Sequence, residues 1–244
     1  MIRSRLADRF VLSPNVEPRR NNRPVDMLLL HYTGMATAAS ALDWLCNPAS
    51  GVSCHYLVDS DGAITQMVGE EMRAWHAGAS MWAGEADTNS RSIGIEIHNP
   101  GHALGYADFP QAQMGAVIEL CQDILTRHAI QPRHVLAHSD VAPGRKIDPG
   151  ERFDWQRLHA AGIGHWVPPE LGRLAEPLQA EALRGFQQLL GNYGYGLEIT
   201  GILDGPARRV TAAFQRHFWP ARVDGIPDRS TLATLEKLIA ALPG

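Results

Sequence analysis

The sequence has 244 residues, of which 45% are hydrophobic and 20% are charged, a balance typical of folded proteins with a full hydrophobic core. The formal net charge of -4 and the lack of a basic run argue against a nucleic-acid partner and against binding to an anionic membrane surface. No stretch approaches the roughly 20 apolar residues that a membrane-spanning helix needs, so no membrane span is expected.

The three cysteines, Cys46, Cys54 and Cys121, are far apart in the sequence and form no CxxC pair. We therefore expect buried thiols and neither a disulfide framework nor a cysteine metal site. Residues 1–20 are polar, contain several arginines and lack the apolar core of a signal peptide. We expect a cytoplasmic monomer, or a periplasmic or cell-envelope protein if a leader is missing from this sequence.

The first half of the chain predicts strands and one short helix. Residues 1–24 contain three prolines and are expected to form an extended arm. The apolar run in residues 25–32 predicts a buried strand that stops at His31. Residues 37–46 have apolar residues at helical spacing, and residues 55–67 predict a hairpin around an Asp-Gly turn.

Residues 92–98 alternate between apolar and other side chains, which predicts a strand. Ile93, Ile95 and Ile97 share one face, and Glu96 lies on the other. A strand this apolar belongs in the middle of a sheet, where a carboxylate is costly unless it has a partner. Glu96 is therefore a residue that needs an explanation.

The following segments complete a mixed α/β pattern. Residues 110–128 carry an apolar helical stripe that Asp108 is placed to cap. Residues 134–138 predict a short strand followed by a loop, and residues 154–161 predict a helix. Strands interleaved with helices predict an α/β domain with a central mixed β-sheet flanked by helices, ending near residue 165.

Glycines and prolines in residues 166–177 predict a linker. A small three-helix unit is expected after it, over residues 178–244. Its core is modest for its length, so we expect it to lean on the larger domain. The helical patterns cover residues 178–190 (ended by Gly191), 206–218 and 229–241.

Three residues at strand ends or in loops suggest a metal site. His31, His138 and Asp148 supply two imidazoles and one carboxylate, which is the ligand count of a catalytic zinc site with its fourth position open. The alternative is that each histidine is an ordinary hydrogen-bonded or surface residue. Asp148, which precedes Pro149-Gly150, equally fits an ordinary turn.

Two further residues suggest catalysis beside such a metal. Glu96 fits a general base, and its alternative is a buried carboxylate paired with an arginine. Lys146 fits a group that stabilises an oxyanion, and its alternative is a solvated loop lysine.

Several stretches together resemble the zinc N-acetylmuramoyl-L-alanine amidases of the peptidoglycan recognition protein superfamily, the type 2 amidases. The resemblance spans about residues 26–160 in the order and spacing of that family. The matching stretches are Leu30-His31-Tyr32-Thr33, His55 to Gly62, Ala74-Trp75-His76-Ala77-Gly78, Ser92 to Glu96, His138 to Gly150 and Phe153-Asp154-Trp155.

The C-terminal unit is similar to a peptidoglycan-binding domain, although more loosely. Repeated Phe-Gln pairs and Asp-Gly turns carry this second resemblance. The implied organisation is a zinc amidase domain in residues 1–165, a linker in 166–177 and a peptidoglycan-binding-like three-helix domain in 178–244.

The family resemblance implies a role for each matching residue. His31, His138 and Asp148 match the zinc ligands, Glu96 matches the catalytic glutamate, and Lys146 matches the lysine that assists the carbonyl. The resemblance also implies that the zinc lies in a surface groove of the mixed sheet.

The roles of the remaining candidates are more open. His76 lies in a stretch that forms the groove wall in this family, so it is a candidate substrate contact or a structural hydrogen-bonding residue. Tyr32 follows the first ligand and is also a candidate substrate contact. His55 and His98 are expected to be structural.

The resemblance implies zinc-dependent hydrolysis of the amide between N-acetylmuramic acid, or its 1,6-anhydro form, and L-alanine of the stem peptide. The expected partners are peptidoglycan fragments or peptidoglycan. Two alternatives remain: a non-catalytic peptidoglycan-binding or sensing module, and cleavage of another amide within the stem peptide. The C-terminal unit is expected to brace the fold or to shape the groove.

Overall fold

A six-stranded mixed sheet organises the larger part of the computed structural model, which describes residues 2–171 and 176–242. The strand order is β1-β5-β4-β7-β3-β8, and all neighbours are parallel except β4 and β5, which form the expected hairpin. This sheet and its flanking helices confirm the predicted fold class. The strands are β1 (Arg9–Phe10), β3 (Met27–Tyr32), β4 (Tyr56–Val58), β5 (Ile64–Gln66), β7 (Ser92–Ile97) and β8 (Val135–Ala137).

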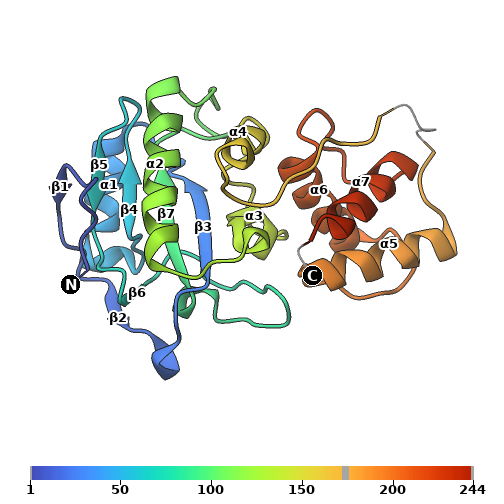
Figure 1. Cartoon of the computed structure of the whole chain (residues 1–244), viewed down its shortest axis with the longest axis horizontal. Coiled ribbons are helices and arrows are strands. Elements are labelled where there is room, and N and C mark those ends of the chain that lie inside the picture. The colour runs from blue at the N-terminus through green and yellow to red at the C-terminus, as the bar shows by residue number, and fades with distance from the viewer. Residues whose placement is uncertain (1, 172–175, 243–244) are drawn as a thin grey trace.

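Four helices accompany the sheet, and the long α2 lies across one of its faces (Figure 1). Helix α1 begins where the sequence predicts because Thr37 and Ser40 form a capping box that satisfies free backbone N–H groups. The helices are α1 (Ala38–Leu45), α2 (Gln111–Arg127), α3 (His138–Val141) and α4 (Trp155–Ala160).

Two details of these helices differ from the prediction. Asp108 does not cap α2, because Pro110 occupies the capping position and the Asp108 carboxylate instead pairs with Arg152 at 2.9 Å. The predicted loop after β8 begins with the short helix α3, so His138 is the first residue of a helical turn that follows strand residue Ala137.

The two faces of the sheet bury different side chains. Leu28 and Leu30 of β3 pack with the isoleucines of β7 and with α2 in one core cluster. Leu29 faces the opposite side, and His31 follows it in the same alternation. His31 is paired with Glu96 across the β3–β7 ladder. The ends of the two central strands therefore place a histidine and a carboxylate side by side on this second face.

The C-terminal helical unit, residues 176–242, contains three helices, and residues 172–175 of the predicted linker lie outside the described part of the chain. Asp204 and Asp228 cap the second and third of them by accepting hydrogen bonds from backbone N–H groups. The prediction that Gly191 ends the first helix is wrong: the helix continues to Tyr193 and ends at Gly194, whose φ is 142°. The helices are α5 (Ala180–Tyr193), α6 (Gly205–Phe218) and α7 (Arg229–Ala240).

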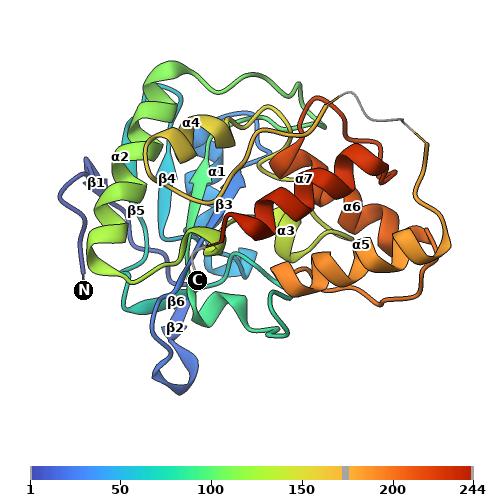
Figure 2. The ribbon, with the colours of Figure 1, turned by 45° about the vertical axis from the view of Figure 1, so that its right-hand side comes forward.

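This unit packs beside α3 and against the second face of the sheet (Figures 1 and 2). One core cluster contains residues from the sheet, from α3 and from the C-terminal helical unit, so the two parts share buried apolar surface. Its members include Met27, Leu29, Trp82, Leu136, Val141, Phe186, Leu190, Phe214 and Phe218.

The predicted N-terminal arm contributes strands. Besides β1, it supplies β2 (Val16–Pro18), which pairs with β6 (Met72–Ala74) in an antiparallel two-stranded sheet. Among the described residues, no helix is both long and apolar enough to cross a membrane. Short 3-10 helices occupy Arg20–Asn22, Pro48–Ser50, Thr88–Ser90 and Pro132–His134.

The three cysteines are free thiols, as expected. Cys54 and Cys121 are buried, whereas Cys46 is only half-buried, so the expectation of a buried thiol is wrong for that residue.

Candidate active site

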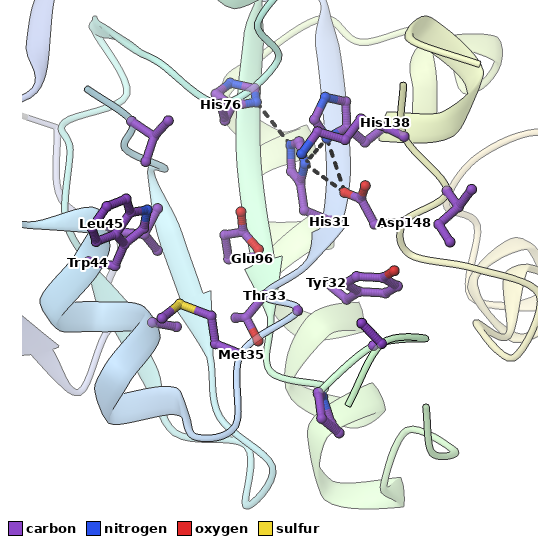
Figure 3. A pocket seen from close by; sticks show the side chains of 18 of the residues that line it. His31, Tyr32, Thr33, Met35, Trp44, Leu45, His76, Glu96, His138 and Asp148 are labelled. Atoms are coloured by element: carbon purple, nitrogen blue, oxygen red, sulfur yellow. Dashed lines mark hydrogen bonds and ion pairs between the residues drawn. The ribbon is translucent and has the colours of Figure 1, made fainter. Parts of the chain in front are cut away.

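Three side chains from distant parts of the chain meet on the second face of the sheet. His31 comes from β3, His138 from the start of α3, and Asp148 from the loop after it. His31 Nδ1 lies 2.8 Å from His138 Nδ1, and each of these nitrogens lies 3.1 Å from Asp148 Oδ2 (Figure 3). All three side chains are buried. The structure thus brings together the three residues expected to bind metal.

The outer nitrogen of each imidazole is hydrogen bonded to the protein. His138 Nε2 donates to the carbonyl of Ala77 at 3.0 Å. His31 Nε2 lies 3.0 Å from His76 Nδ1, and His76 Nε2 lies 3.2 Å from the hydroxyl of Ser92, which donates its own proton to a backbone carbonyl. The Ser92 oxygen therefore accepts from His76 Nε2–H, and His76 Nδ1 accepts from His31 Nε2–H.

This proton arrangement fits a metal ion. Both Nδ1 lone pairs and a carboxylate oxygen converge without a proton between them, and ligand atoms of a tetrahedral zinc are about 3.3 Å apart. Burial, and then the charge of His138, lowers the pKa of His31 to about 4, so its imidazole stays neutral as a metal ligand must. Outer hydrogen bonds of this kind orient ligand rings in metal sites. The donor set fits a divalent cation with an open fourth position.

Glu96 lies beside this cluster, in register with His31 on the neighbouring strand (Figure 3). Its Oε2 is buried and has no hydrogen-bond partner among the described residues. Burial, and then the negative charge of Asp148, raises the pKa of Glu96 well above the usual carboxyl range, although Lys146 acts in the opposite direction. No arginine pairs with it in the described part of the chain, so the observed contacts do not support the structural alternative.

Lys146 lies on the same loop as Asp148 and lines the groove above the cluster. Its backbone N–H donates to the carbonyl of Ala142 at 3.0 Å, which closes a turn after α3. The side chain is half-buried, and its positive charge lowers the pKa of both Glu96 and His31. The lysine therefore lines the same groove as Glu96 and Asp148, close enough for its charge to act on Glu96.

The cluster forms the floor of a groove of about 450 Å³. Met35, Trp44 and Leu45 line one side, and Tyr32 lines the other (Figure 3). Trp44 is 49% exposed, which is unusual for a tryptophan on a helix that packs against a sheet. The groove therefore offers an apolar aromatic wall opposite a polar one.

The two candidate substrate contacts lie in different surroundings. His76 is 9% exposed and uses both ring nitrogens within the protein, which favours the structural alternative for it. The Tyr32 hydroxyl lies 3.1 Å from His102 Nδ1, and His102 Nε2 lies 3.2 Å from the carboxylate of Glu151. Tyr32 is thus positioned on the groove wall by a histidine that the sequence analysis did not single out.

His55 and His98 lie outside the cluster. His55 Nδ1 accepts from the N–H of Gly94 at 3.0 Å and its Nε2 donates to the carbonyl of Met72, so it links two strands. Burial, and then the charge of Arg19, lowers its pKa to about 3. His98 Nδ1 lies 3.3 Å from the hydroxyl of a neighbouring threonine. These contacts are consistent with the structural roles expected for both.

The sequence analysis missed several groove residues, among them Trp44 and His102. Trp44 lies off the apolar stripe of α1, and that displacement is a signal that a search for exposed aromatic residues would detect. His102 lies in a loop without periodicity, so nothing in the sequence links it to Tyr32.

Comparisons with known proteins show which proteins this chain is similar to. The family model described as N-acetylmuramoyl-L-alanine amidase matches residues 21–151, and a model for a peptidoglycan binding domain matches residues 179–235. N-acetylmuramoyl-L-alanine amidase AmiD of Escherichia coli K12 is 38% identical over 88% of this chain and 82% of its own length. The 1,6-anhydro-N-acetylmuramyl-L-alanine amidase AmpD of Enterobacter cloacae is 39% identical over 62% of this chain and 88% of its own length.

Solved structures extend the similarity to both parts of the chain. AmiD from E. coli, in complex with the substrate anhydro-N-acetylmuramic acid-L-Ala-D-gamma-Glu-L-Lys, has a TM-score of 0.78 and 37% identity over 92% of each chain. AmpDh3 from Pseudomonas aeruginosa, in complex with anhydromuramic pentapeptide, has a TM-score of 0.77 and 32% identity over 93% of this chain and 96% of that one. The amidase family model covers more than half of this sequence, so the chain belongs to the N-acetylmuramoyl-L-alanine amidase family.

Proposed function

We propose that this chain is a zinc-dependent amidase of peptidoglycan recycling or turnover. It hydrolyses the amide between N-acetylmuramic acid, or its 1,6-anhydro form, and the L-alanine that begins the stem peptide. The observation that carries the proposal is the convergence of His31, His138 and Asp148 beside Glu96 on the floor of a groove. The anhydromuramyl peptides bound to AmiD and AmpDh3 support the substrate class.

Zinc is the proposed metal because two neutral imidazoles and one carboxylate, with one position free, match catalytic zinc sites. Bound there, zinc supplies Lewis acidity, which polarises a carbonyl and acidifies water. His31 and His138 keep their Nδ1 lone pairs available because His76 and Ala77 accept the protons of the outer nitrogens.

Glu96 acts as the general base and then as the general acid. It takes a proton from the attacking water as the carbon–oxygen bond forms. It delivers that proton to the amide nitrogen as the carbon–nitrogen bond breaks and the amino group of L-alanine leaves. The same carboxylate can serve both steps because it lies beside the proposed metal ligands, in register with His31. Lys146 stabilises the negative charge that develops on the carbonyl oxygen.

The groove walls suggest how the substrate is oriented. The exposed ring of Trp44 provides a flat apolar surface for the less polar face of the sugar. The hydroxyl of Tyr32, held by His102, is available for hydrogen bonding to the peptide on the opposite wall. In this arrangement the scissile amide lies above the three metal ligands.

Incubating purified protein with an anhydromuramyl tripeptide, with and without a chelator, tests the proposal. We expect two products by mass spectrometry, anhydro-N-acetylmuramic acid and the free peptide, only when zinc is present. Cleavage that survives complete removal of metal contradicts the mechanism. Products that come from a cut within the stem peptide contradict the assigned bond.

The match of residues 179–235 to a peptidoglycan binding domain favours a second candidate, a module that binds peptidoglycan without cleaving it. Glu96→Ala separates the two functions. If the biological activity depends on binding alone, this variant retains it. If the amidase reaction is required, the variant loses activity while it still binds peptidoglycan.

A further inference from the structure

Asp140 lies two residues after His138, in the buried boundary between the sheet and the C-terminal helical unit. Its Oδ2 accepts hydrogen bonds from the backbone N–H of Ala137 at 2.8 Å and from Nδ1–H of His217 at 2.7 Å. Its Oδ1 accepts from the hydroxyl of Tyr195 at 2.7 Å. A fully buried carboxylate requires such partners, and two of these three come from the C-terminal helical unit.

The bond to Ala137 fixes the turn at which β8 becomes α3. Asp140 reaches back to the N–H that precedes the helix, as in a capping box, and His138 is the first residue after that point. Within the same turn, the N–H of Ser139 donates to the carbonyl of Asp148 at 3.0 Å. The Asp140 carboxylate is therefore hydrogen bonded to the turn that carries His138, and the backbone of that turn is hydrogen bonded to Asp148.

The partners of this carboxylate are themselves held by packing. The ring of His217, on α6, is stacked between Trp155 and Phe218, with centroid distances of 3.7 and 4.0 Å. The ring of Tyr195 packs edge to face against Trp82 at 5.0 Å. Aromatic packing therefore holds both rings in place around Asp140.

A second connection runs through the loop of residues 77–85. The first carbonyl of this loop accepts the hydrogen bond from His138 Nε2–H at 3.0 Å. Further along, the N–H of Ala83 donates to the carbonyl of Gly194 in the C-terminal helical unit at 2.8 Å. Both the position and the ring orientation of His138 are thus tied to the same unit.

We propose that Asp140 is a positioning residue through which the C-terminal helical unit holds His138 for the metal. Tyr195 and His217 then set the affinity of a metal site that they do not touch. This inference rests on the proposed function, because it requires that the site binds zinc. It gives the C-terminal helical unit a role in the amidase site in addition to any binding of peptidoglycan.

Two tyrosines of the full chain provide a matched pair of variants. Tyr195→Phe removes only the hydroxyl that donates to Asp140. Tyr193→Phe is the control, because Tyr193 is also buried in the C-terminal helical unit and its hydroxyl is paired with His165 Nδ1 at 2.9 Å. Each variant loses one buried hydrogen bond. Only the bond lost in Tyr195→Phe is connected, through Asp140, to the turn that carries His138.

Zinc affinity is measured by competition with a chromophoric chelator, and the stability of the metal-free protein is measured by urea unfolding. We expect Tyr195→Phe to weaken zinc binding by about tenfold, the lower end of the loss seen when direct hydrogen-bond partners of metal ligands are removed, because Tyr195 acts through Asp140. We expect Tyr193→Phe to leave zinc affinity unchanged at a similar loss of stability. The visible absorption of the Co²⁺-loaded protein, which reports ligand geometry, changes in Tyr195→Phe only.

Wild-type zinc affinity in Tyr195→Phe overturns the proposal. Equal weakening of zinc binding by both variants also overturns it, because loss of stability alone then explains the effect. A wild-type chain that binds no zinc contradicts the proposed metal site itself, and this inference fails with it. The wild-type titration therefore separates failure of the proposed function from failure of the coupling.

Discussion

Asp148 contributes the one carboxylate of the three converging side chains, and its charge balances a divalent cation better than a neutral ligand can. Asp148→Ala leaves two imidazoles, which are too few for a stable zinc site. We expect bound zinc, measured by mass spectrometry of the metal in purified protein, to fall from stoichiometric to near zero. The control is Asp154→Ala, which removes the cap of α4 and about 1 kcal/mol of stability but keeps the metal. Stoichiometric zinc in Asp148→Ala contradicts the site as drawn.

We expect Glu96 to lower the free energy of unfolding although the proposed reaction requires it. Burial and the charge of Asp148 raise its pKa in the metal-free folded protein, so above the ordinary carboxyl range the folded state binds more protons than the unfolded chain. Stability therefore falls as the pH rises above the ordinary carboxyl range. Glu96→Gln removes this cost, so we expect the metal-free variant to be about 1 kcal/mol more stable than wild type at neutral pH.

The same variant is expected to lose activity by about 10² to 10⁴-fold, because glutamine cannot carry a proton. Urea unfolding in the presence of chelator, repeated across pH, measures the stability difference. The advantage of Glu96→Gln shrinks to nothing as the pH falls below the unfolded carboxyl pKa. A variant no more stable than wild type at any pH refutes the argument that this carboxylate is strained by burial.

At the scale of elements, the sequence predicted the strands and helices whose formation depends on the local pattern of apolar residues. The alternation of residues 92–98 and the apolar run of residues 25–32 correspond to the central strands β7 and β3. The pairing of His31 with Glu96 was not predictable, because it depends on strand order, which no local pattern encodes. The family resemblance, and not periodicity, linked these two residues before the structure did.

Errors in the predicted helices have specific physical reasons. Asp108 fits a cap by residue type, but its carboxylate is paired with Arg152, a partner 44 positions away. Gly191 resembles a helix stop, yet α5 passes through it, since packing of the flanking Leu190 and Tyr193 outweighs the roughly 1 kcal/mol cost of a glycine in a helix. In α5 a tertiary contact overrode a local preference, whereas the start of α2 at Gln111 leaves Asp108 two residues before the capping position.

Glu70 links the loop before β6 to the end of α2, and its side chain is fully buried. Burial alone would raise its pKa, but hydrogen bonds from His128, Arg127 and Tyr56 lower it to about 2. The shift corresponds to about 3 kcal/mol of stability. Because the folded-state pKa is lowered, this stability is present above about pH 4.5 and is lost as the pH falls toward 2.

We therefore expect Glu70→Gln to lower the free energy of unfolding by about 3 kcal/mol at neutral pH. Its stability also depends less on pH between about 4.5 and 2 than that of the wild type. Glu119→Gln, an exposed change on α2, the helix whose end Glu70 contacts, provides the control and costs less than about 0.5 kcal/mol. If the free energy of unfolding of Glu70→Gln falls as steeply with decreasing pH as that of the wild type, another carboxylate causes the acid sensitivity.

At the scale of the whole molecule, the sequence predicted two units and a linker, with the smaller unit leaning on the larger. It did not predict the buried contacts of Asp140 with Tyr195 and His217, which are 55 and 77 positions away. The local sequence pattern around each of these residues predicts only its own helix or turn, so no pattern predicted that the three residues are in contact. What joins the units is a shared core and a buried polar cluster, and both depend on the tertiary fold.

The shared core predicts that the chain unfolds as one cooperative unit. Leu29 of the sheet and Phe214 of α6 belong to the same apolar cluster, so removing one unit exposes buried surface on the other. We expect a single calorimetric transition whose calorimetric and van't Hoff enthalpies agree. Phe214→Ala, which costs about 3–5 kcal/mol, lowers the midpoint of that whole transition. If the variant instead shows a second transition at the wild-type temperature, the sheet unfolds independently, and the C-terminal helical unit cannot be the support that holds His138.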